Sequence, residues 1–394
     1  MRHPLEKTVF EHLEKNGSSL MAFWEELVNM ESGSEYKEGV DKAADRVAGE
    51  LRKIGAETEI LRFDKAGNSV AAVLGGDRKG VPVALLGHYD TVFPKGTVEK
   101  RPFKIEDGKA FGPGVLDMKG GVALLIYAAR ALEEAGFTDR PIRIILAGDE
   151  EVAHKNSPMA QVFEERSRGC IAAFNCETGS LSNSIVVGRK GVIQCRMAVK
   201  GLAVHAGREP QKGRSAILEL ARKIVDIHSL TDYGRGLTFN VGTVKGGVVP
   251  NAVPDFAEAG IDVRCVSTGQ IAEAKEKLEA LAAKTYIDGT STELSYTSTF
   301  LPMEQTPGNE RLFRYVAEIY RELGLSEPSM EFSGGGSDSA FSVAAGVPTV
   351  DQMGVKGEWN HSDREYAAAD SIFERAKVLA ACILNIGRFG GSRQ

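Results

Sequence analysis

Short apolar runs alternate with stretches of helical spacing over the first half of this 394-residue chain. The runs have the length of buried strands and lie at residues 69–74, 81–86, 142–147 and 170–174. Helical spacing covers residues 5–31, 39–54 and 119–134, the last closed by Gly136. Strands that alternate with helices form a largely parallel sheet that is covered on both faces. We therefore predict an α/β fold with a doubly wound, mostly parallel sheet.

A different pattern begins near residue 190 and ends near residue 301. Apolar and polar residues alternate from 192 to 200, and the order then reads helix, strand, strand, helix, strand. The elements expected there are helices at 215–228 and 269–284 and strands at 237–244, 257–266 and 293–300. This order predicts a ferredoxin-like α+β domain. Because the first kind of pattern resumes after residue 302, we expect residues 190–301 to be inserted into a domain made of residues 1–189 and 302–394.

Charge and composition exclude several classes of protein. The 48 lysines and arginines against 54 aspartates and glutamates give a net charge of −6, which is no basic footprint for nucleic acid or anionic membranes. No apolar run approaches the length of a membrane span, and the N-terminal residues do not form a secretory signal. The five cysteines contain no Cys-x-x-Cys pair, which favours a reducing compartment. We expect a cytoplasmic protein with no nucleic-acid or membrane partner.

Histidines and acids collect where the expected strands end. His88 and Asp90 follow one strand, and with a period of two they point the same way. Asp90 could then hold one imidazole nitrogen while the other binds a metal, although a capped loop histidine is the plainer interpretation of this pair alone. Glu150 and Glu151 follow another strand, where adjacent like charges are costly unless a cation neutralises them. Glu177 and His361 follow two further strands.

Asp117 stands just ahead of the helix expected at 119–134, and a helix N-cap would explain it. The glycines at 112–121 suggest a dinucleotide loop, but the third glycine of that motif is missing and no clear strand leads into it. The run 333–339 contains a serine but lacks the closing glycine of a nucleophile elbow. Four further histidines belong to no motif of this kind and are interpreted as surface or packing residues: His3, His12, His154 and His228.

The acids and histidines all fall on one rim of the expected sheet, where open α/β folds bind ligands. Two histidines with carboxylates and no thiolate suit zinc, with cobalt or manganese as substitutes. So many carboxylates favour two ions about 3.5–4 Å apart that share one of them. The chain has no His-Glu-x-x-His helix, which excludes the helical zinc-protease plan.

Three segments closely resemble those of metallopeptidase family M20, the di-zinc glutamate carboxypeptidases, aminoacylases and related deacylases. They are residues 87–91, 112–121 and 149–151, and the similarity extends over nearly the whole chain. The resemblance implies that one zinc is bound by His88 and Glu177, the other by Glu151 and His361, and both by Asp117. It also implies that Asp90 orients His88 and that Glu150 is the general base.

Residues 190–301 resemble the family's lid or dimerisation domain. The resemblance implies that His205 reaches the active site of a partner subunit and stabilises the oxyanion. Asn251 and Arg264 look like binders of a substrate carboxylate, for which the planar guanidinium is well suited. Backbone N–H groups around Gly335 and Gly336 could cradle the same carboxylate. A homodimer formed through the lid domain is expected.

The implied function is hydrolysis of an amide bond that releases a C-terminal amino acid from a small peptide or an N-acyl amino acid. Glutamate at position 177, where aminopeptidase-like members carry aspartate, favours the carboxypeptidase branch. An N-acyl-amino-acid deacylase or a dipeptidase with the same site is the nearest alternative. A metal-binding protein without turnover is another class, although every implied ligand and the base are present.

Overall fold

A computed structural model describes residues 3–390 of the chain, which divides into two compact units. Unit 1 contains the residues up to Gly188, Gln305–Phe332 and the residues from Ser337 onward. Unit 2 contains Arg189–Glu304 and Ser333–Gly336. The insertion expected at 190–301 thus corresponds closely to unit 2, which also takes the glycine run that we had assigned to the other domain. Each unit is described by itself.

Unit 1 is built on a six-stranded sheet. Its strands, in spatial order, are β1 (Glu57–Leu61), β2 (Ser69–Leu74), β6 (Ile142–Ala147), β3 (Val83–His88), β7 (Ala172–Asn175) and β15 (Thr349–Val350). The four strands from β6 to β15 pair in parallel, whereas β1 and β2 are antiparallel. The predicted α/β class and mostly parallel sheet are confirmed, with an antiparallel edge on one side.

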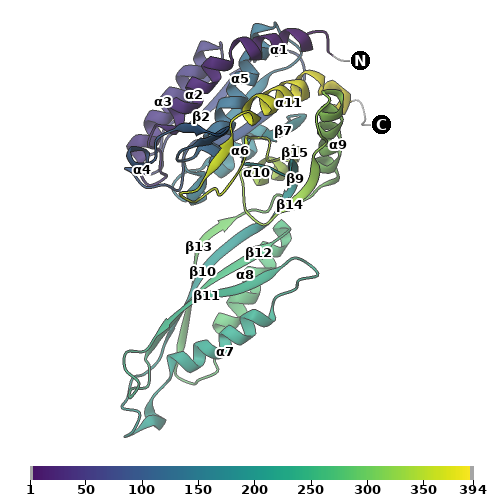
Figure 1. The fold of residues 1–394 in the computed structure, drawn as a ribbon. Coiled ribbons are helices and arrows are strands. Elements are labelled where there is room, and N and C mark those ends of the chain that lie inside the picture. The colour runs from purple at the N-terminus through teal and green to yellow at the C-terminus, as the bar shows by residue number, and fades with distance from the viewer. Residues whose placement is uncertain (1–2, 391–394) are drawn as a thin grey trace. The chain divides into compact units, whose positions relative to one another are not determined.

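Helices cover both faces of this sheet, as a doubly wound fold requires (Figure 1). One face shares a core with α1 (Glu6–Lys15), α2 (Gly17–Val28), α3 (Lys37–Lys53), α5 (Gly120–Glu134), α9 (Pro307–Glu322) and α11 (Ser371–Asn385). Leu85 and Ile144 point into that core, while Leu86 and Ile145 are buried on the opposite face. There α6 (Met159–Ser167) and α10 (Ser339–Ala344) contact the sheet. Two short helices, α4 (Thr97–Lys100) and α12 (Gly387–Gly390), complete this set.

Strand register brings the chemical residues to one edge of the sheet. His88, the last residue of β3, is level with Ala147 of β6, and Leu86 is level with Asn175 of β7. The acids that follow β6 and β7 therefore emerge beside His88. Helix α5 begins close to this edge because Gly121 has no side chain: a Cβ atom there would lie 1.9 Å from the carbonyl oxygen of Cys176.

Two small sheets in unit 1 were not anticipated from the sequence. A five-stranded one contains, in order, β4 (Lys104–Glu106), β5 (Lys109–Phe111), β17 (Tyr366–Ala368), β16 (Lys356–Glu358) and β8 (Gly179–Ser180). The other pairs β14 (Ser329–Ser333) with β9 (Ser184–Arg189). The strands of the five-stranded sheet have two or three residues each, too few for a readable periodicity. The connection between β16 and β17 holds His361, so the five-stranded sheet positions that side chain.

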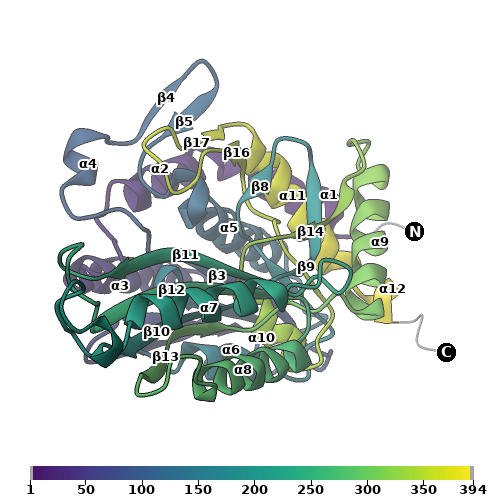
Figure 2. The same cartoon turned by 90° about the horizontal axis from the view of Figure 1, so that it is seen from below.

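Unit 2 has the predicted order strand, helix, strand, strand, helix, strand (Figure 2). The elements are β10 (Gly191–Lys200), α7 (Ala216–Ser229), β11 (Thr238–Gly246), β12 (Phe256–Cys265), α8 (Thr268–Ala283) and β13 (Ser291–Phe300). The antiparallel strands lie in the order β11, β12, β10, β13. Alternate residues of β10 and β12, such as Met197 and Ile261, form a core with Leu220 of α7 and Leu278 of α8. Both helices therefore pack on one face, as in a ferredoxin-like fold.

Within residues 3–390, no helix is both long and apolar enough to cross a membrane. The five cysteines are buried and unpaired in disulfides.

Candidate metal centre and active site

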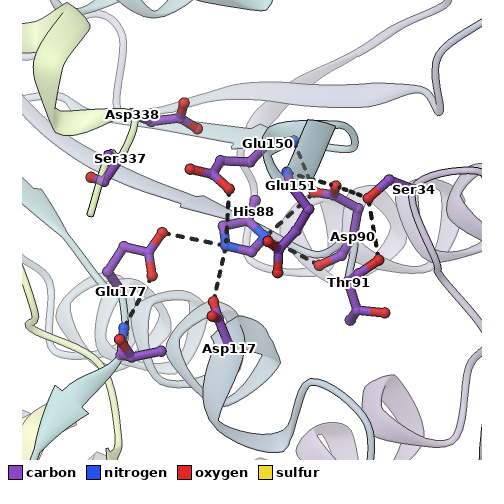
Figure 3. Close-up of polar contacts among 12 residues, drawn as sticks. Ser34, His88, Asp90, Thr91, Asp117, Glu150, Glu151, Glu177, Ser337 and Asp338 are labelled. Carbon is purple, nitrogen blue, oxygen red and sulfur yellow. Dashed lines mark hydrogen bonds and ion pairs between the residues drawn. The ribbon is translucent and has the colours of Figure 1, made fainter. Parts of the chain in front are cut away.

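His88 is the centre of a first group of possible metal ligands. Its imidazole is 1% exposed, and Nε2 lies 3.3 Å from Asp117 Oδ1 and 3.3 Å from Glu177 Oε1 (Figure 3). Burial lowers the pKa of His88, but the carboxylates of Glu177 and Asp117 outweigh it and hold that pKa well above the ordinary value. The other ring nitrogen, Nδ1, faces Asp90, at 3.1 Å from its carbonyl oxygen and 3.4 Å from Oδ1.

Asp117 also belongs to a second group, with Glu151 and His361. His361 Nε2 lies 3.1 Å from Asp117 Oδ2 and 3.1 Å from Glu151 Oε2. The two carboxylate oxygens of Asp117 therefore face different histidines. In each group, one donor atom per residue lies within 4.8 Å of the others, so each group has the compactness of a metal site.

The buried carboxylates of these two groups repel one another, and bound cations would stabilise them. Burial, followed by repulsion from Asp117, raises the pKa of Glu177 and brings that of Glu151 to about 7. Glu151 Oε1 is buried and has no hydrogen-bond partner within the described residues. A buried carboxylate cluster of this kind is stabilised when divalent cations neutralise it. Mixed nitrogen and oxygen donors with one shared carboxylate suit a pair of ions such as zinc.

Asp90 connects the segment that follows β3 to the segment that follows β6. Its carboxylate accepts hydrogen bonds from the backbone N–H groups of Glu150 and Glu151, both at 3.1 Å, and from Ser34 Oγ at 2.6 Å. Burial raises the pKa of Asp90, but His88 and Ser34 outweigh it and lower that pKa below the ordinary value. An ionised Asp90 can therefore orient His88 and fix the backbone of the acidic pair.

Glu150 lies beside the ligand groups without belonging to either. Its Oε2 is 4.0 Å from His88 Nε2, and Figure 3 shows its side chain on the same side of the cluster as Asp338. Burial raises the pKa of Glu150, and the charges of Asp338 and Glu177 raise it further, against the lowering effect of His88. A carboxylate with a raised pKa beside a metal centre has the properties of a general base.

The position of Asp117 excludes the interpretation of this residue as the cap of α5. Helix α5 begins at Gly120 and Lys119 holds its N-cap position, so Asp117 lies two residues too early in the chain. The side chain accepts a hydrogen bond from Asn360 Nδ2 at 3.0 Å and faces the two histidines instead of the helix N-terminus.

Sequence reasoning missed the carboxylate that holds this segment. Glu365 is fully buried and accepts hydrogen bonds from the N–H groups of Gly114 at 2.9 Å, Leu116 at 3.0 Å and Asp117 at 2.9 Å. The segment that carries His361 thus also fixes the backbone of the shared ligand. The only available signal was the short spacing between His361 and Glu365.

A cavity of about 450 Å³ adjoins Glu151 in unit 1. Its remaining walls include Ser34, Tyr36, Phe93, Lys95 and Val152. The wall is largely apolar with one cation, Lys95, whose ammonium group lies 4.2 Å from the centre of the Tyr36 ring. The cavity has room for an organic group next to the second ligand set.

In unit 2 the structure brings His205 and Asn251 together. The segment that follows β10 and the segment that precedes β12 form an antiparallel bridge between His205 and Ala252. The Ala206 N–H also donates to the carbonyl oxygen of Asn251 at 2.9 Å. Both side chains are exposed. They lie beyond the end of the sheet at which Lys200 pairs with Phe256.

Arg264 lies at the opposite end of β12, about 26 Å from Phe256 at the usual rise of a strand. Its guanidinium donates to both carboxylate oxygens of Asp262 and to the carbonyl of Gly334 at 3.2 Å. One N–H remains on each terminal nitrogen, and these two N–H groups can donate to the two oxygens of a carboxylate. Gly335 and Gly336 adjoin Gly334, so the structure places them near Arg264 and separates this set from Asn251 and His205 within one copy of unit 2.

Two groups of possible metal ligands with a carboxylate beside them are typical of metal-dependent hydrolases. The protein belongs to the class of hydrolases that act on peptide or amide bonds. The chain belongs to peptidase family M20/M25/M40, and the sequence model of that family matches residues 84–385. Divalent metal is used throughout this metallopeptidase family, and the two ligand groups fall within the matched residues.

Individual proteins show the same relationship. The chain is 29% identical over 370 residues to carboxypeptidase G2 of Pseudomonas sp. (strain RS-16), covering 92% of this chain and 88% of that protein. It is 26% identical over 343 residues to succinyl-diaminopimelate desuccinylase of Dechloromonas aromatica (strain RCB), covering 82% and 87%.

Solved structures share the fold at lower sequence identity. The aminopeptidase PepT from Bacillus cereus has a TM-score of 0.76 at 22% identity, covering 93% of this chain and 98% of that one. The metallo-carboxypeptidase Sso-CP2 from Sulfolobus solfataricus has a TM-score of 0.74 at 18% identity, with coverage of 93% and 98%.

Proposed function

We propose that this protein is a di-zinc carboxypeptidase that releases a C-terminal amino acid, glutamate in the first instance, from a small peptide or an N-acyl amino acid. The observation that carries the proposal is the pair of ligand groups joined through Asp117, with Glu150 beside them. The likeness to carboxypeptidase G2 favours the carboxypeptidase branch. Cobalt or manganese would substitute for zinc with the same donors.

Each side chain has a definite task in this proposal. His88, Asp117 and Glu177 would hold one zinc, and Asp117, Glu151 and His361 would hold the other. When bound, the ions polarise the scissile carbonyl and lower the pKa of water at the site. Glu150 takes the proton of the attacking water and gives it to the departing nitrogen. Asp90 keeps His88 in the orientation that binding requires.

The leaving amino acid is recognised by its free α-carboxylate. Arg264 retains one N–H on each terminal nitrogen after its contacts with Asp262 and Gly334, which matches the two oxygens of a carboxylate. The N–H groups near Gly335 and Gly336 add further donors. The apolar cavity beside Glu151 accommodates the acyl side of the substrate.

A deacylase with the same metal centre is the second candidate, and the similarity to succinyl-diaminopimelate desuccinylase favours it. A carboxypeptidase and a deacylase cleave the same kind of bond and differ in the acyl group that they accept. A dipeptidase would in addition require a free amino group on the acyl side. A panel of acyl groups on a constant glutamate separates these activities.

The first test is a screen of the zinc-reconstituted protein on N-benzoyl, N-acetyl, N-succinyl and alanyl derivatives of L-glutamate, each with a free or an amidated α-carboxylate. Amidation should lower kcat/KM by about 100-fold, because an Arg–carboxylate pair is lost. Arg264→Gln should lower kcat/KM for the free acids and leave the amides unchanged. Arg311→Gln, an exposed arginine on α9, serves as the matched control. Equal rates on free and amidated substrates would remove the carboxylate from the proposal.

We further propose that the protein acts as a homodimer through unit 2 and that His205 serves the active site of the partner subunit. Arg264 and His205 lie too far apart in one unit to meet a single small substrate, since about 26 Å of strand separates their ends of the sheet. Two copies resolve this separation if each supplies one of the two residues. His205 would then stabilise the oxyanion. Asn251 beside it, which is expected to bind the substrate carboxylate, would reach the site from the same partner subunit.

Mixing two inactive variants tests this arrangement. Glu150→Gln and His205→Ala should each be nearly inactive alone. After dissociation and random reassociation of equal amounts, half of the dimers are mixed and each has one intact site. The expected recovery is therefore about a quarter of wild-type activity. Recovery that stays at background would place His205 in the site of its own chain, near-normal activity of His205→Ala alone would place it outside catalysis, and a monomer in sedimentation would contradict the dimer.

A further inference from the structure

His154, interpreted from the sequence as a surface or packing residue, lies between two buried carboxylates. Its Nδ1 is 3.0 Å from Asp149 Oδ1, and its Nε2 is 2.6 Å from Asp338 Oδ1. The side chains of all three residues are at most 2% exposed. An imidazole that donates to carboxylates from both nitrogens is positively charged. Burial lowers the pKa of His154, but Asp338 and Asp149 outweigh it and hold that pKa well above the ordinary value.

This contact closes the turn that carries the acidic pair. The backbone N–H of His154 donates to the carbonyl of Asp149 at 3.1 Å, and that of Ala153 donates to the carbonyl of Glu150 at 2.7 Å. Ala153 and His154 both have positive φ, at 54° and 52°, in the region that favours glycine. Two such residues in succession are strained and persist only where surrounding contacts hold them. The two imidazole–carboxylate bonds supply such contacts.

Asp338, the carboxylate that contacts His154 Nε2, is itself held in place by its neighbours. Asp338 directly precedes α10, and the neighbouring hydroxyls of Ser337 and Ser339 both donate to Asp351 Oδ2. The His154 ring also packs against both Phe163 and Phe341, with centroids 6.0 and 5.8 Å away. The imidazole is therefore held by rigid neighbours on α6 and α10. It links the turn at residues 149–154 to a well-anchored part of unit 1.

Glu150 is consequently held from two directions. Asp90 accepts from the backbone N–H groups of Glu150 and Glu151 on one side. Asp149, which immediately precedes Glu150, is bound by His154 on the other side. We propose that His154 is a positioning residue for Glu150: it fastens the 149–154 turn to Asp338 so that the base is held at one distance from the metal centre. This inference rests on the proposed function, in which Glu150 is the base.

The test compares His154→Ala and Asp338→Asn with His228→Ala, an exposed histidine on α7. With N-benzoyl-L-glutamate as substrate, His154→Ala should lower kcat by about 10- to 100-fold, because a small displacement of a catalytic group has an effect of this size. KM should change by less than about threefold and the zinc content should stay at the wild-type value, since ground-state binding is untouched. Imidazole in the buffer should restore part of kcat in His154→Ala and have no effect on His228→Ala.

Amide hydrogen exchange gives a readout that does not depend on turnover. In His154→Ala the peptide covering residues 148–158 should exchange faster than in wild type, whereas peptides from β3 and β7 should not change. Asp338→Asn should show the same pattern, and the double variant should be no worse than His154→Ala, because Asp338→Asn weakens a contact that His154→Ala already removes. Asp338→Asn keeps the shape of the side chain and remains informative if His154→Ala does not fold.

Several results would overturn the assignment: a kcat within about twofold of wild type, a loss of zinc in proportion to activity, or additive effects of the two changes. If the wild-type protein hydrolyses nothing in the panel but exchange at 148–158 still depends on His154, the proposed function fails and the link between His154 and the turn stands. If hydrolysis occurs and His154→Ala leaves kcat unchanged, only the positioning role fails.

Discussion

Glu150→Gln is expected to lower kcat by at least about 10³-fold and to leave both metal ions bound. Glutamine has the shape of glutamate but cannot accept the proton of the attacking water, and the loss of a general base costs about 10²–10⁴-fold. Glu150 lies outside both ligand groups, with its carboxylate 4.0 Å from His88, so the donors to the ions are unchanged. KM should remain near the wild-type value because ground-state binding does not use this proton transfer.

The measurement is turnover of N-benzoyl-L-glutamate together with metal content per chain by mass spectrometry. Glu164→Gln provides the control, since Glu164 lies on α6 with a partly exposed side chain paired to Arg168. Near-normal turnover in Glu150→Gln with two ions bound would exclude Glu150 as the base. A fall in metal content that matches the fall in activity would instead place Glu150 among the ligands.

Asp117→Ala is expected to abolish activity and to reduce the metal content from two ions per chain to at most one. Asp117 directs one oxygen toward His88 and the other toward His361, so its removal takes a donor from both groups. By contrast, His361→Ala should affect only the group that contains Glu151. The wild-type protein treated with a chelator should lose activity in the same way and regain it with zinc, cobalt or manganese.

Metal titration followed by calorimetry checks this prediction. An ion that binds only the folded protein stabilises it by about 2.7 kcal/mol at a free concentration of 100 times Kd. Wild type should therefore melt at a higher temperature with metal than without, and Asp117→Ala should gain much less. Asp77→Ala, an exposed aspartate in a turn, should behave as wild type. Two tightly bound ions in Asp117→Ala would exclude the shared-ligand arrangement.

The fold could be predicted to a large extent because the central strands of unit 1 are continuous apolar runs and the helices carry apolar residues at helical spacing, with a side-chain cap at α7 and α9. Ser215, for example, accepts from the Leu218 N–H at the start of α7, close to the predicted boundary. The long helical stretch at 5–31 was less well predicted, since it is two helices that meet at Asn16. The five-stranded sheet around His361 was missed because its strands have two or three residues each.

The candidate site could be predicted where one strand end explains one side chain. His88 and Glu151 follow adjacent parallel strands, and strand register alone brings such residues together. Asp117 was ambiguous because a ligand and an N-cap both stand just ahead of a helix, and only the exact start of α5 and the contacts of the side chain separate them. The roles of His154 and Glu365 could not be predicted, since their partners Asp338 and Gly114 lie far along the chain.

The shared ligand also couples the two ends of the chain during assembly. His88, Asp117 and Glu177 are complete once the chain has been made to residue 177, whereas the second group waits for His361. Glu365, which fixes the Asp117 backbone, arrives with that same late segment. A chain truncated before residue 356 would therefore keep the side chains of one group while losing the support of its central carboxylate. The metal site therefore forms correctly only when the C-terminal segment is present. A fragment can carry the first three ligands and still fail to hold them in the geometry of the full-length enzyme.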